Sequence, residues 1–211
     1  MQESALREEI CSLGRSIFER GLTHGSTGNI SARCGEGWLL TPTGSNLGRL
    51  DPARLSKLDW SGTLLSGDPP SKESFLHLAM YQERDRNQAV VHLHATHSVA
   101  VSVLEGLDVD DVLPPLTAYY VMRIGTLPLV PYYAPGDMAL AEAVRGYAGK
   151  HHALLLANHG PVVAGTSLAA AADAVEELEA TAKLHLLLQG QRVRPLTPAQ
   201  VADIRRRYPA D

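Results

Sequence analysis

The sequence lacks the features that would place the protein in a membrane or outside the cell. No apolar run approaches the roughly eighteen residues of a membrane-spanning helix. The first residues, MQESALREEI, are polar and acidic, unlike a secretory signal peptide. Cys11 and Cys34 are the only cysteines, too few for a disulfide framework and typical of a reducing compartment. We therefore expect a cytoplasmic protein with no membrane partner.

The sequence also lacks an excess of positive charge. It has 19 Lys and Arg residues against 23 Asp and Glu residues, a net charge of −4, which argues against a nucleic-acid partner. Internal repeats, low-complexity segments and linkers are absent too. The 211 residues are enough for one sizeable core, so we expect residues 1–211 to form a single domain.

The hydrophobic pattern predicts alternating helices and strands. Helices are expected over 4–20, 98–104 and 167–189, and others should begin at Ser71, Asp137 and Thr197. Strands are expected over 29–34, 37–41, 55–60, 63–66, 89–95, 126–130, 153–157 and 161–164. An irregular stretch should follow Pro114 and Pro115. This mixture predicts an α/β domain with a mixed or largely antiparallel sheet.

Three histidines carry most of the information about function. His92 and His94 alternate within the apolar run VVHLHA, so on a strand both side chains point to the same face. His159 lies at a sharp turn between two apolar runs, in LLLANHGPVVAG. Three neutral nitrogen ligands with an open position are typical of a catalytic divalent-metal site.

The other histidines carry no such signal. His97 has the opposite parity to the pair and opens the next helix, and His77 follows Glu73 by one helical turn, where we expect only packing. Even the pair at 92 and 94 would more often be ordinary strand residues if it stood alone.

Glu73 lies where a helix can receive an anion. With Ser71 as the N-cap, Glu73 falls in the first turn, beside free backbone N–H groups and Lys72. This arrangement suggests an acid/base next to a bound phosphate or carboxylate. The commoner role of such a glutamate is to complement the helix dipole.

Two glycine turns resemble anion-binding loops. They are Thr27-Gly28-Asn29 and Thr43-Gly44-Ser45, in which glycine permits close backbone approach and the neighbouring side chains donate hydrogen bonds. Arg33 and Arg49 add positive charge nearby in the sequence. Neither turn is specific alone, and ordinary tight turns are equally frequent.

Taken together, these motifs resemble one family. GSTGNIS, TPTGSNLG, PSKE, VHLHATHS and LANHGP, in this order and spacing, are similar to the class II aldolase/adducin family over essentially the whole chain. The resemblance implies a three-layer α/β/α fold around a mostly antiparallel mixed sheet. It also implies a lyase that forms a homotetramer, with active sites near subunit interfaces and a tyrosine arriving from a neighbour.

The resemblance also implies roles for individual residues. His92, His94 and His159 match zinc ligands, with Mn²⁺ and Co²⁺ as alternatives to Zn²⁺, and Glu73 matches an acid/base that also ligates the resting metal. Tyr119 or Tyr120 falls near the position of the neighbour's tyrosine. The expected phosphate-binding positions are Gly28, Asn29, Thr43, Gly44, Ser71 and Lys72.

Within the family, the flanking segments resemble the subgroup that decarboxylates 3-oxo-tetronate 4-phosphate. The sugar-phosphate aldolases usually carry a second serine where this sequence has Lys72. Loss of CO2 from such a phosphorylated sugar acid leaves a metal-held enediolate of dihydroxyacetone phosphate, which Glu73 or a tyrosine protonates. A fuculose-phosphate type aldolase, a ribulose-phosphate 4-epimerase and a non-catalytic adducin-like scaffold are the alternatives.

Overall fold

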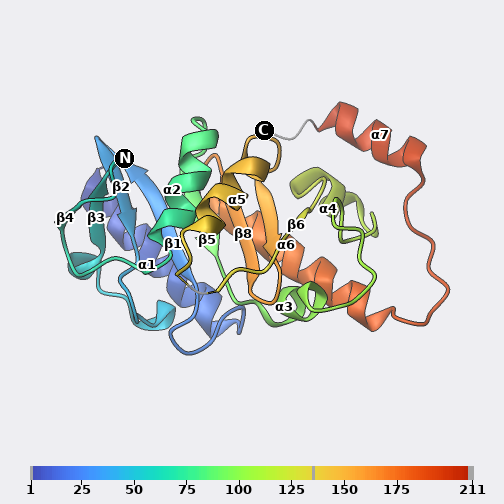
Figure 1. Ribbon diagram of the computed structural model, residues 1–211, viewed down its shortest axis with the longest axis horizontal. Helices are drawn as coiled ribbons and strands as arrows, with labels where there is room; N and C mark the ends of the chain where they lie inside the picture. Colours follow the sequence, from blue (N-terminus) through green and yellow to red (C-terminus); the bar gives the residue numbers. More distant parts are fainter. Residues whose placement is uncertain (1, 135, 209–211) are drawn as a thin grey trace.

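Eight strands form one sheet at the centre of the molecule. The computed structural model describes residues 2–134 and 136–208, and its strands lie in the order β4-β3-β2-β1-β5-β8-β7-β6 (Figure 1). The strands are β1 (Asn29–Cys34), β2 (Gly37–Leu40), β3 (Ser56–Asp59), β4 (Leu64–Ser66), β5 (Ala89–His92), β6 (Leu129–Val130), β7 (Ala153–Leu156) and β8 (Gly160–Gly165).

Every strand pair is antiparallel except β6–β7. The expected mixed, mostly antiparallel sheet is therefore confirmed. At its centre β5 pairs with β1 on one side and β8 on the other, so that His92 lies between Asn29 and Val162. This register brings the start of β1, the end of β5 and the start of β8 together at one end of these central strands.

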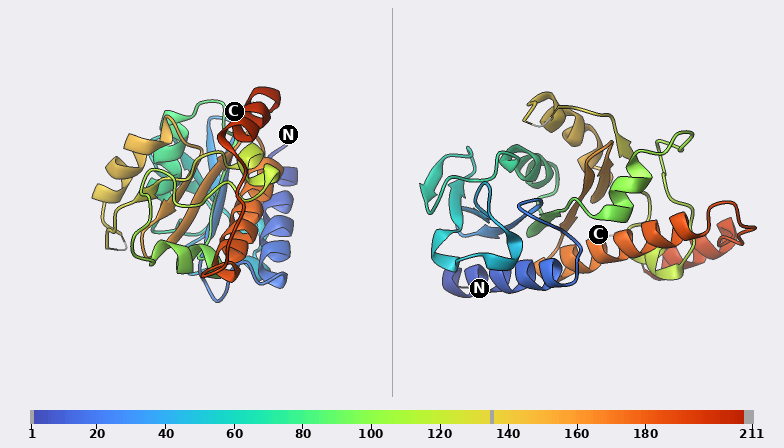
Figure 2. Two further views of the ribbon diagram at one scale, coloured as in Figure 1. Left: turned by 90° about the vertical axis from the view of Figure 1, so that its right-hand side faces the viewer. Right: turned by 90° about the horizontal axis from the view of Figure 1, so that it is seen from below.

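Helices cover both faces of the sheet, which gives the three expected layers (Figure 2). The core on one face packs α1 (Glu3–Glu19), α3 (Thr96–Ser102), α4 (Ala118–Arg123) and α6 (Leu168–Leu187). The core on the other face packs α2 (Ser74–Glu83) and α5 (Ala139–Ala148). Strand alternation explains this division, because Val91 faces the first core and Val90 the second.

The last helix, α7 (Pro198–Arg207), contacts α4 at the end of the molecule farthest from β4 (Figure 1). Thr197 caps its start, as the sequence predicts, and forms a capping box with Gln200. No helix in the part of the chain that the structure describes is both long and apolar enough to span a membrane.

Three local predictions are wrong. Helix α2 begins at Ser74 rather than at Ser71, because the Ser71 hydroxyl is engaged by the Asn29 amide and by the Glu73 N–H. Strand β5 ends at His92, before His94, as the chain turns into α3. The stretch with Tyr119 and Tyr120 is helical, since the Thr117 side chain caps α4.

Candidate active site

His92 is held rigidly at the end of β5. Its side chain is fully buried, and its Nδ1 lies 2.8 Å from the carbonyl oxygen of Pro161 in β8. The carbonyl can only accept, so Nδ1 carries the hydrogen and the neutral ring has its lone pair on Nε2. That Nε2 is buried and has no hydrogen-bond partner among the described residues.

His159 reaches the same place from the turn between β7 and β8. Asn158 has a φ of 58° and Gly160 a φ of 147°, both in the left-handed half of the map. A Cβ at Gly160 would lie 2.3 Å from the carbonyl oxygen of Leu93. Glycine is therefore required for this turn to press against β5 and direct the His159 ring toward His92.

His94 follows β5, and the chain after it is fixed by a buried carboxylate. Glu179 of α6 accepts hydrogen bonds from the backbone N–H groups of His97 and Ser98, at 2.9 and 2.8 Å, and from the Ser98 hydroxyl. These bonds satisfy free N–H groups at the start of α3. The turn that carries His94 is therefore tied to the long helix α6.

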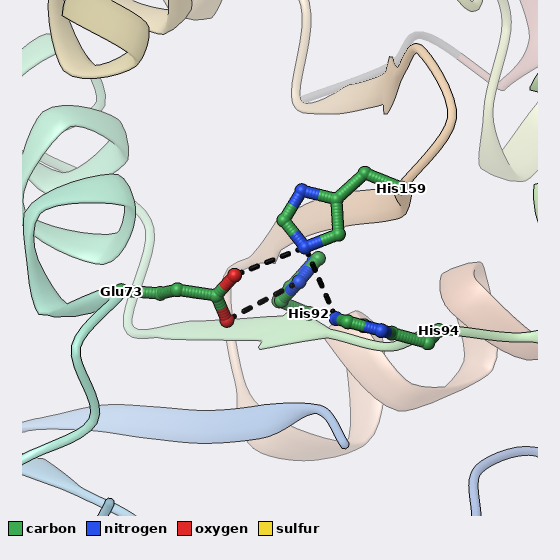
Figure 3. A group of neighbouring side chains, drawn as sticks. All are labelled: Glu73, His92, His94 and His159. Carbon is green, nitrogen blue, oxygen red and sulfur yellow. Dashed lines mark hydrogen bonds and ion pairs between the residues drawn. The ribbon is translucent and has the colours of Figure 1, made fainter. Parts of the chain in front are cut away.

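Glu73, the N-cap residue of α2, completes the group from the helix layer on the other face of the sheet from α3 and α6 (Figure 3). Its carboxylate lies 3.0 Å from Nε2 of His159 and 3.5 Å from Nε2 of His92. Nε2 of His94 is 3.1 Å from Nε2 of His159. We call these four residues the histidine cluster; their potential ligand atoms all lie within 4.8 Å of one another.

Burial and neighbouring groups shift the pKa values of three residues in the histidine cluster. It lowers the pKa of His92 and, with the neighbouring histidines, lowers that of His94 to about 4, so both rings are neutral near pH 7. Burial alone would raise the pKa of Glu73, but His92, His159 and Asn29 outweigh it and hold the pKa below its ordinary value. The neutral imidazoles of His92 and His94 thus lie beside an ionised carboxylate.

These donors fit a divalent metal ion. The lone pair of His92 Nε2 faces the Glu73 carboxylate, which is unfavourable unless a cation lies between them. Ligands about 2.1 Å from a tetrahedral ion lie about 3.4 Å apart, close to the separations in the cluster. Imidazole nitrogen with one carboxylate is a donor set that suits zinc and neighbouring transition metals.

A polar side chain links the histidine cluster to the predicted anion site. Asn29, at the start of β1, donates from Nδ2 to Glu73 at 2.7 Å and to the Ser71 hydroxyl at 3.1 Å. Gly28, with a φ of 81°, packs closely on the carbonyl of His92 and directs the chain into β1. Asn29 and Ser71 therefore lie directly beside the cluster.

The other expected phosphate-binding residues lie next to Ser71. The Thr43 N–H donates to the carbonyl of Pro69, and Pro42 pairs with Pro70, so the 43–45 turn lies against the segment before α2. Thr43, Gly44 and Lys72 are exposed. We call residues 27–29, 43–45 and 69–72 the anion-side turns; the 43–45 turn also lines a cavity of about 270 Å³ with Arg49.

The two tyrosines named from the sequence lie outside the cavity at the histidine cluster. Tyr120 is buried in the core beside Asp111, and Tyr119 is exposed on α4. A cavity of about 560 Å³ at the cluster is lined by two other tyrosines, Tyr132 and Tyr133. The sequence analysis missed these residues, although the polar-tipped pair in PYYAPG offered a signal.

Arg33 and Cys34 pack within the fold, away from the histidine cluster. The Arg33 guanidinium stacks on Trp60 and Tyr81 and donates to backbone carbonyls, among them those of Tyr81 and Asn87. Cys34 is buried at the far end of β1, away from Asn29. Neither residue belongs to the histidine cluster.

Comparison with known sequences identifies relatives of this chain. Residues 8–186 match the family described as Class II Aldolase and Adducin N-terminal domain. The chain is 53% identical to a 3-oxo-tetronate 4-phosphate decarboxylase of Escherichia coli O6:H1, over 96% of each chain.

Solved structures show the same relationship. The crystal structure of YgbL from Escherichia coli superposes with a TM-score of 0.95 at 50% identity, over 96% of this chain and 99% of that one. An L-fuculose 1-phosphate aldolase superposes with a TM-score of 0.84 at 25% identity, over 96% and 95% of the two chains. The chain belongs to the class II aldolase and adducin family.

Proposed function

We propose that this protein is a metal-dependent carboxy-lyase that converts 3-oxo-tetronate 4-phosphate to dihydroxyacetone phosphate and CO2. The observation that carries the proposal is the juxtaposition of the histidine cluster with the anion-side turns, through Asn29 and Ser71. The 53% identity to a decarboxylase of this name, over nearly the full chain, supports the choice of substrate.

His92, His94 and His159 hold the metal, with Glu73 as a fourth ligand when no substrate is bound. Zinc is the proposed ion, with Mn²⁺ and Co²⁺ as alternatives. When bound, it supplies a positive charge that stabilises the negative charge developing on the substrate's ketone oxygen as the bond to the carboxylate breaks. The Pro161 carbonyl keeps His92 in the tautomer that offers Nε2.

The substrate's phosphate binds at the anion-side turns. Asn29 Nδ2, the Ser71 hydroxyl and the backbone N–H groups around Gly28, Thr43 and Gly44 supply hydrogen-bond donors. Lys72 supplies the formal positive charge. Exposure of Thr43, Gly44 and Lys72 leaves the phosphate end open to the incoming substrate.

Glu73 handles the proton. Breaking the C1–C2 bond leaves the electron pair on C2, conjugated with the C3 ketone, and C2 then needs one proton to become the hydroxymethyl carbon of dihydroxyacetone phosphate. The carboxylate of Glu73 is ionised at rest, so it first takes a proton from solvent and then delivers it to C2.

Tyr119 is the residue that we propose to reach a neighbouring subunit's active site. Its side chain is 60% exposed, whereas Tyr120 is buried and stabilises its own chain. The proposal includes a homotetramer of single-domain chains in the cytoplasm, with no nucleic-acid or membrane partner.

The experiment offers the zinc-loaded protein 3-oxo-tetronate 4-phosphate and, separately, fuculose 1-phosphate. The aldolase arm is included because of the structural similarity to an L-fuculose 1-phosphate aldolase. We expect CO2 and dihydroxyacetone phosphate from the first substrate and no cleavage of the second. An aldehyde from the second substrate without CO2 from the first would establish an aldolase instead, and no turnover of either would favour a scaffold.

A further inference from the structure

A chain of buried polar side chains leads away from Glu73 into the second core. His77 of α2 is fully buried, with Nε2 2.5 Å from Oδ1 of Asn29 and Nδ1 2.7 Å from the Ser31 hydroxyl. The Ser31 hydroxyl lies in turn 2.8 Å from the hydroxyl of Tyr81. The function proposed above uses Asn29 and Glu73 but gives His77 no part.

The carboxylate at one end of this chain fixes the direction of every hydrogen bond in it. Glu73 can only accept, so the side-chain atom of Asn29 that faces it must be the Nδ2 donor. The Asn29 oxygen then faces His77, and this oxygen can also only accept. His77 must therefore carry its hydrogen on Nε2.

The remaining two bonds follow from the tautomer of His77. Burial lowers the pKa of His77 to about 3, so the ring is neutral and Nδ1 has a lone pair. Ser31 donates to that lone pair, which leaves its oxygen to accept from Tyr81. Burial also raises the pKa of Tyr81, which keeps its donor hydrogen in place.

We propose that His77 is a positioning residue that holds the Asn29 amide with its nitrogen toward Glu73 and the anion-side turns. The inference rests on the proposed function, because Asn29 is one of the phosphate-binding residues there. An unconstrained amide can rotate to present its oxygen, which would repel both the Glu73 carboxylate and a phosphate. Ser31 and Tyr81 act one step further back by fixing the tautomer of His77.

The surroundings of His77 keep its ring in place. The ring stacks on Trp38, with centroids 6.4 Å apart and an interplanar angle of 16°, and Trp38 is itself fully buried. The hydrogen-bonded atoms of Ser31, His77 and Tyr81 lie in the buried layer between the sheet and α2. Water is therefore excluded from the chain, and a missing donor cannot easily be replaced.

The test compares two amide substitutions that place a donor differently. In His77→Gln the amide nitrogen falls near the position of Nε2 and can still donate to Asn29. In His77→Asn the shorter side chain reaches only the position of Nδ1. We expect H77Q to retain most of the wild-type kcat/KM and H77N to lose about tenfold or more, because the Asn29 nitrogen would no longer be held in its hydrogen bond to a charged partner.

A double-mutant cycle separates positioning from general destabilisation. In an Asn29→Ala background, H77N should cost no further activity, because the residue through which His77 acts is gone. An equal loss from H77N in both backgrounds, or equal activity of H77Q and H77N at matched folded fraction, would overturn the inference. Melting temperatures of all variants establish that the folded fractions match.

A readout that needs no reaction keeps this inference distinct from the proposed function. Nitrogen NMR of protein labelled in histidine, with the His77 signals assigned by their loss in H77Q, reports the tautomer. We expect a neutral ring with hydrogen on Nε2 throughout the neutral pH range. Hydrogen on Nδ1 would overturn the inference even if the protein is a decarboxylase, and hydrogen on Nε2 would support it even if the substrate proves different.

Discussion

At the histidine cluster the side chain of His92 is fully buried, whereas Thr43, Gly44 and Lys72 of the anion-side turns are exposed. Strand pairing, a glycine turn and a buried carboxylate fix the backbone of His92, His159 and the segment after His94. The anion-side turns, by contrast, lie mostly in loops. This difference indicates a fixed site for the proposed metal and an open one for the proposed phosphate, with Asn29 hydrogen-bonded between them.

Removing a ligand from the rigid side should have the largest effect. We expect His159→Ala to weaken zinc binding by at least about a hundredfold, because loss of a direct ligand exceeds the effect of losing a residue behind it. Activity should fall with the bound zinc. Zinc content after dialysis and the rate of CO2 release measure the two effects. His185→Ala, on α6 and outside the histidine cluster, is the matched control and should change neither.

Glu73→Gln should separate metal binding from proton transfer. The amide cannot carry the proton, so kcat should fall about a hundredfold or more, while the three histidines still bind zinc. Zinc content after dialysis and the rate of dihydroxyacetone phosphate release measure the two effects. A variant that releases dihydroxyacetone phosphate at the wild-type rate would show that Glu73 does not protonate the product.

One glycine from each side, Gly160 and Gly44, tests this difference by alanine substitution. At Gly160 a Cβ would meet the Leu93 backbone at 2.3 Å, so G160A should lose about 3 kcal/mol or more of unfolding free energy. At Gly44 the φ is 66° and, chain neighbours aside, no atom of the described residues lies within 4 Å of the Cβ position, so G44A should lose only about 1 kcal/mol of unfolding free energy. Urea unfolding of the zinc-free proteins measures both. Equal losses would contradict the comparison.

Substitution of Lys72 should have the smallest effect on catalysis. We expect Lys72→Ser to raise KM about tenfold, because the substrate's phosphate loses the positive charge of the Lys72 side chain. The change in kcat should be smaller. Steady-state kinetics at low and high salt measure this, and the difference should shrink as salt increases. Lys183→Ala, an exposed lysine on α6, is the control. A fall in kcat with unchanged KM would place Lys72 in the chemical step.

The sequence predicted the strands and the meeting of the three histidines well, because the signals for both are local. The pattern VVHLHA singled out His92 and His94, whose side chains meet although the strand ends at His92, and the AsnHisGly turn singled out His159. Roles of these residues remain predictions. The three-layer class of fold came from the family resemblance, and the structure confirms it, whereas the order of the strands was not predicted.

The features that the sequence did not reveal depend on contacts between distant segments. Ser71 appeared to be an N-cap, but its hydroxyl is held by Asn29, which is 42 residues away. Glu179 caps α3 across 81 residues, and no spacing in the sequence indicates this. His77 was expected only to pack beside Glu73. Its hydrogen bond to Asn29 forms only when β1 and α2 meet in the fold, so the sequence near His77 does not indicate it.

The central claim is that a metal ion on the histidine cluster is required to break the bond to CO2. The most direct measurement titrates zinc into metal-free protein and follows release of labelled CO2 from carboxyl-labelled 3-oxo-tetronate 4-phosphate. We predict that CO2 release rises in proportion to bound zinc and saturates when each chain holds one ion. Release by the metal-free protein at the rate of the zinc-loaded protein would contradict the account.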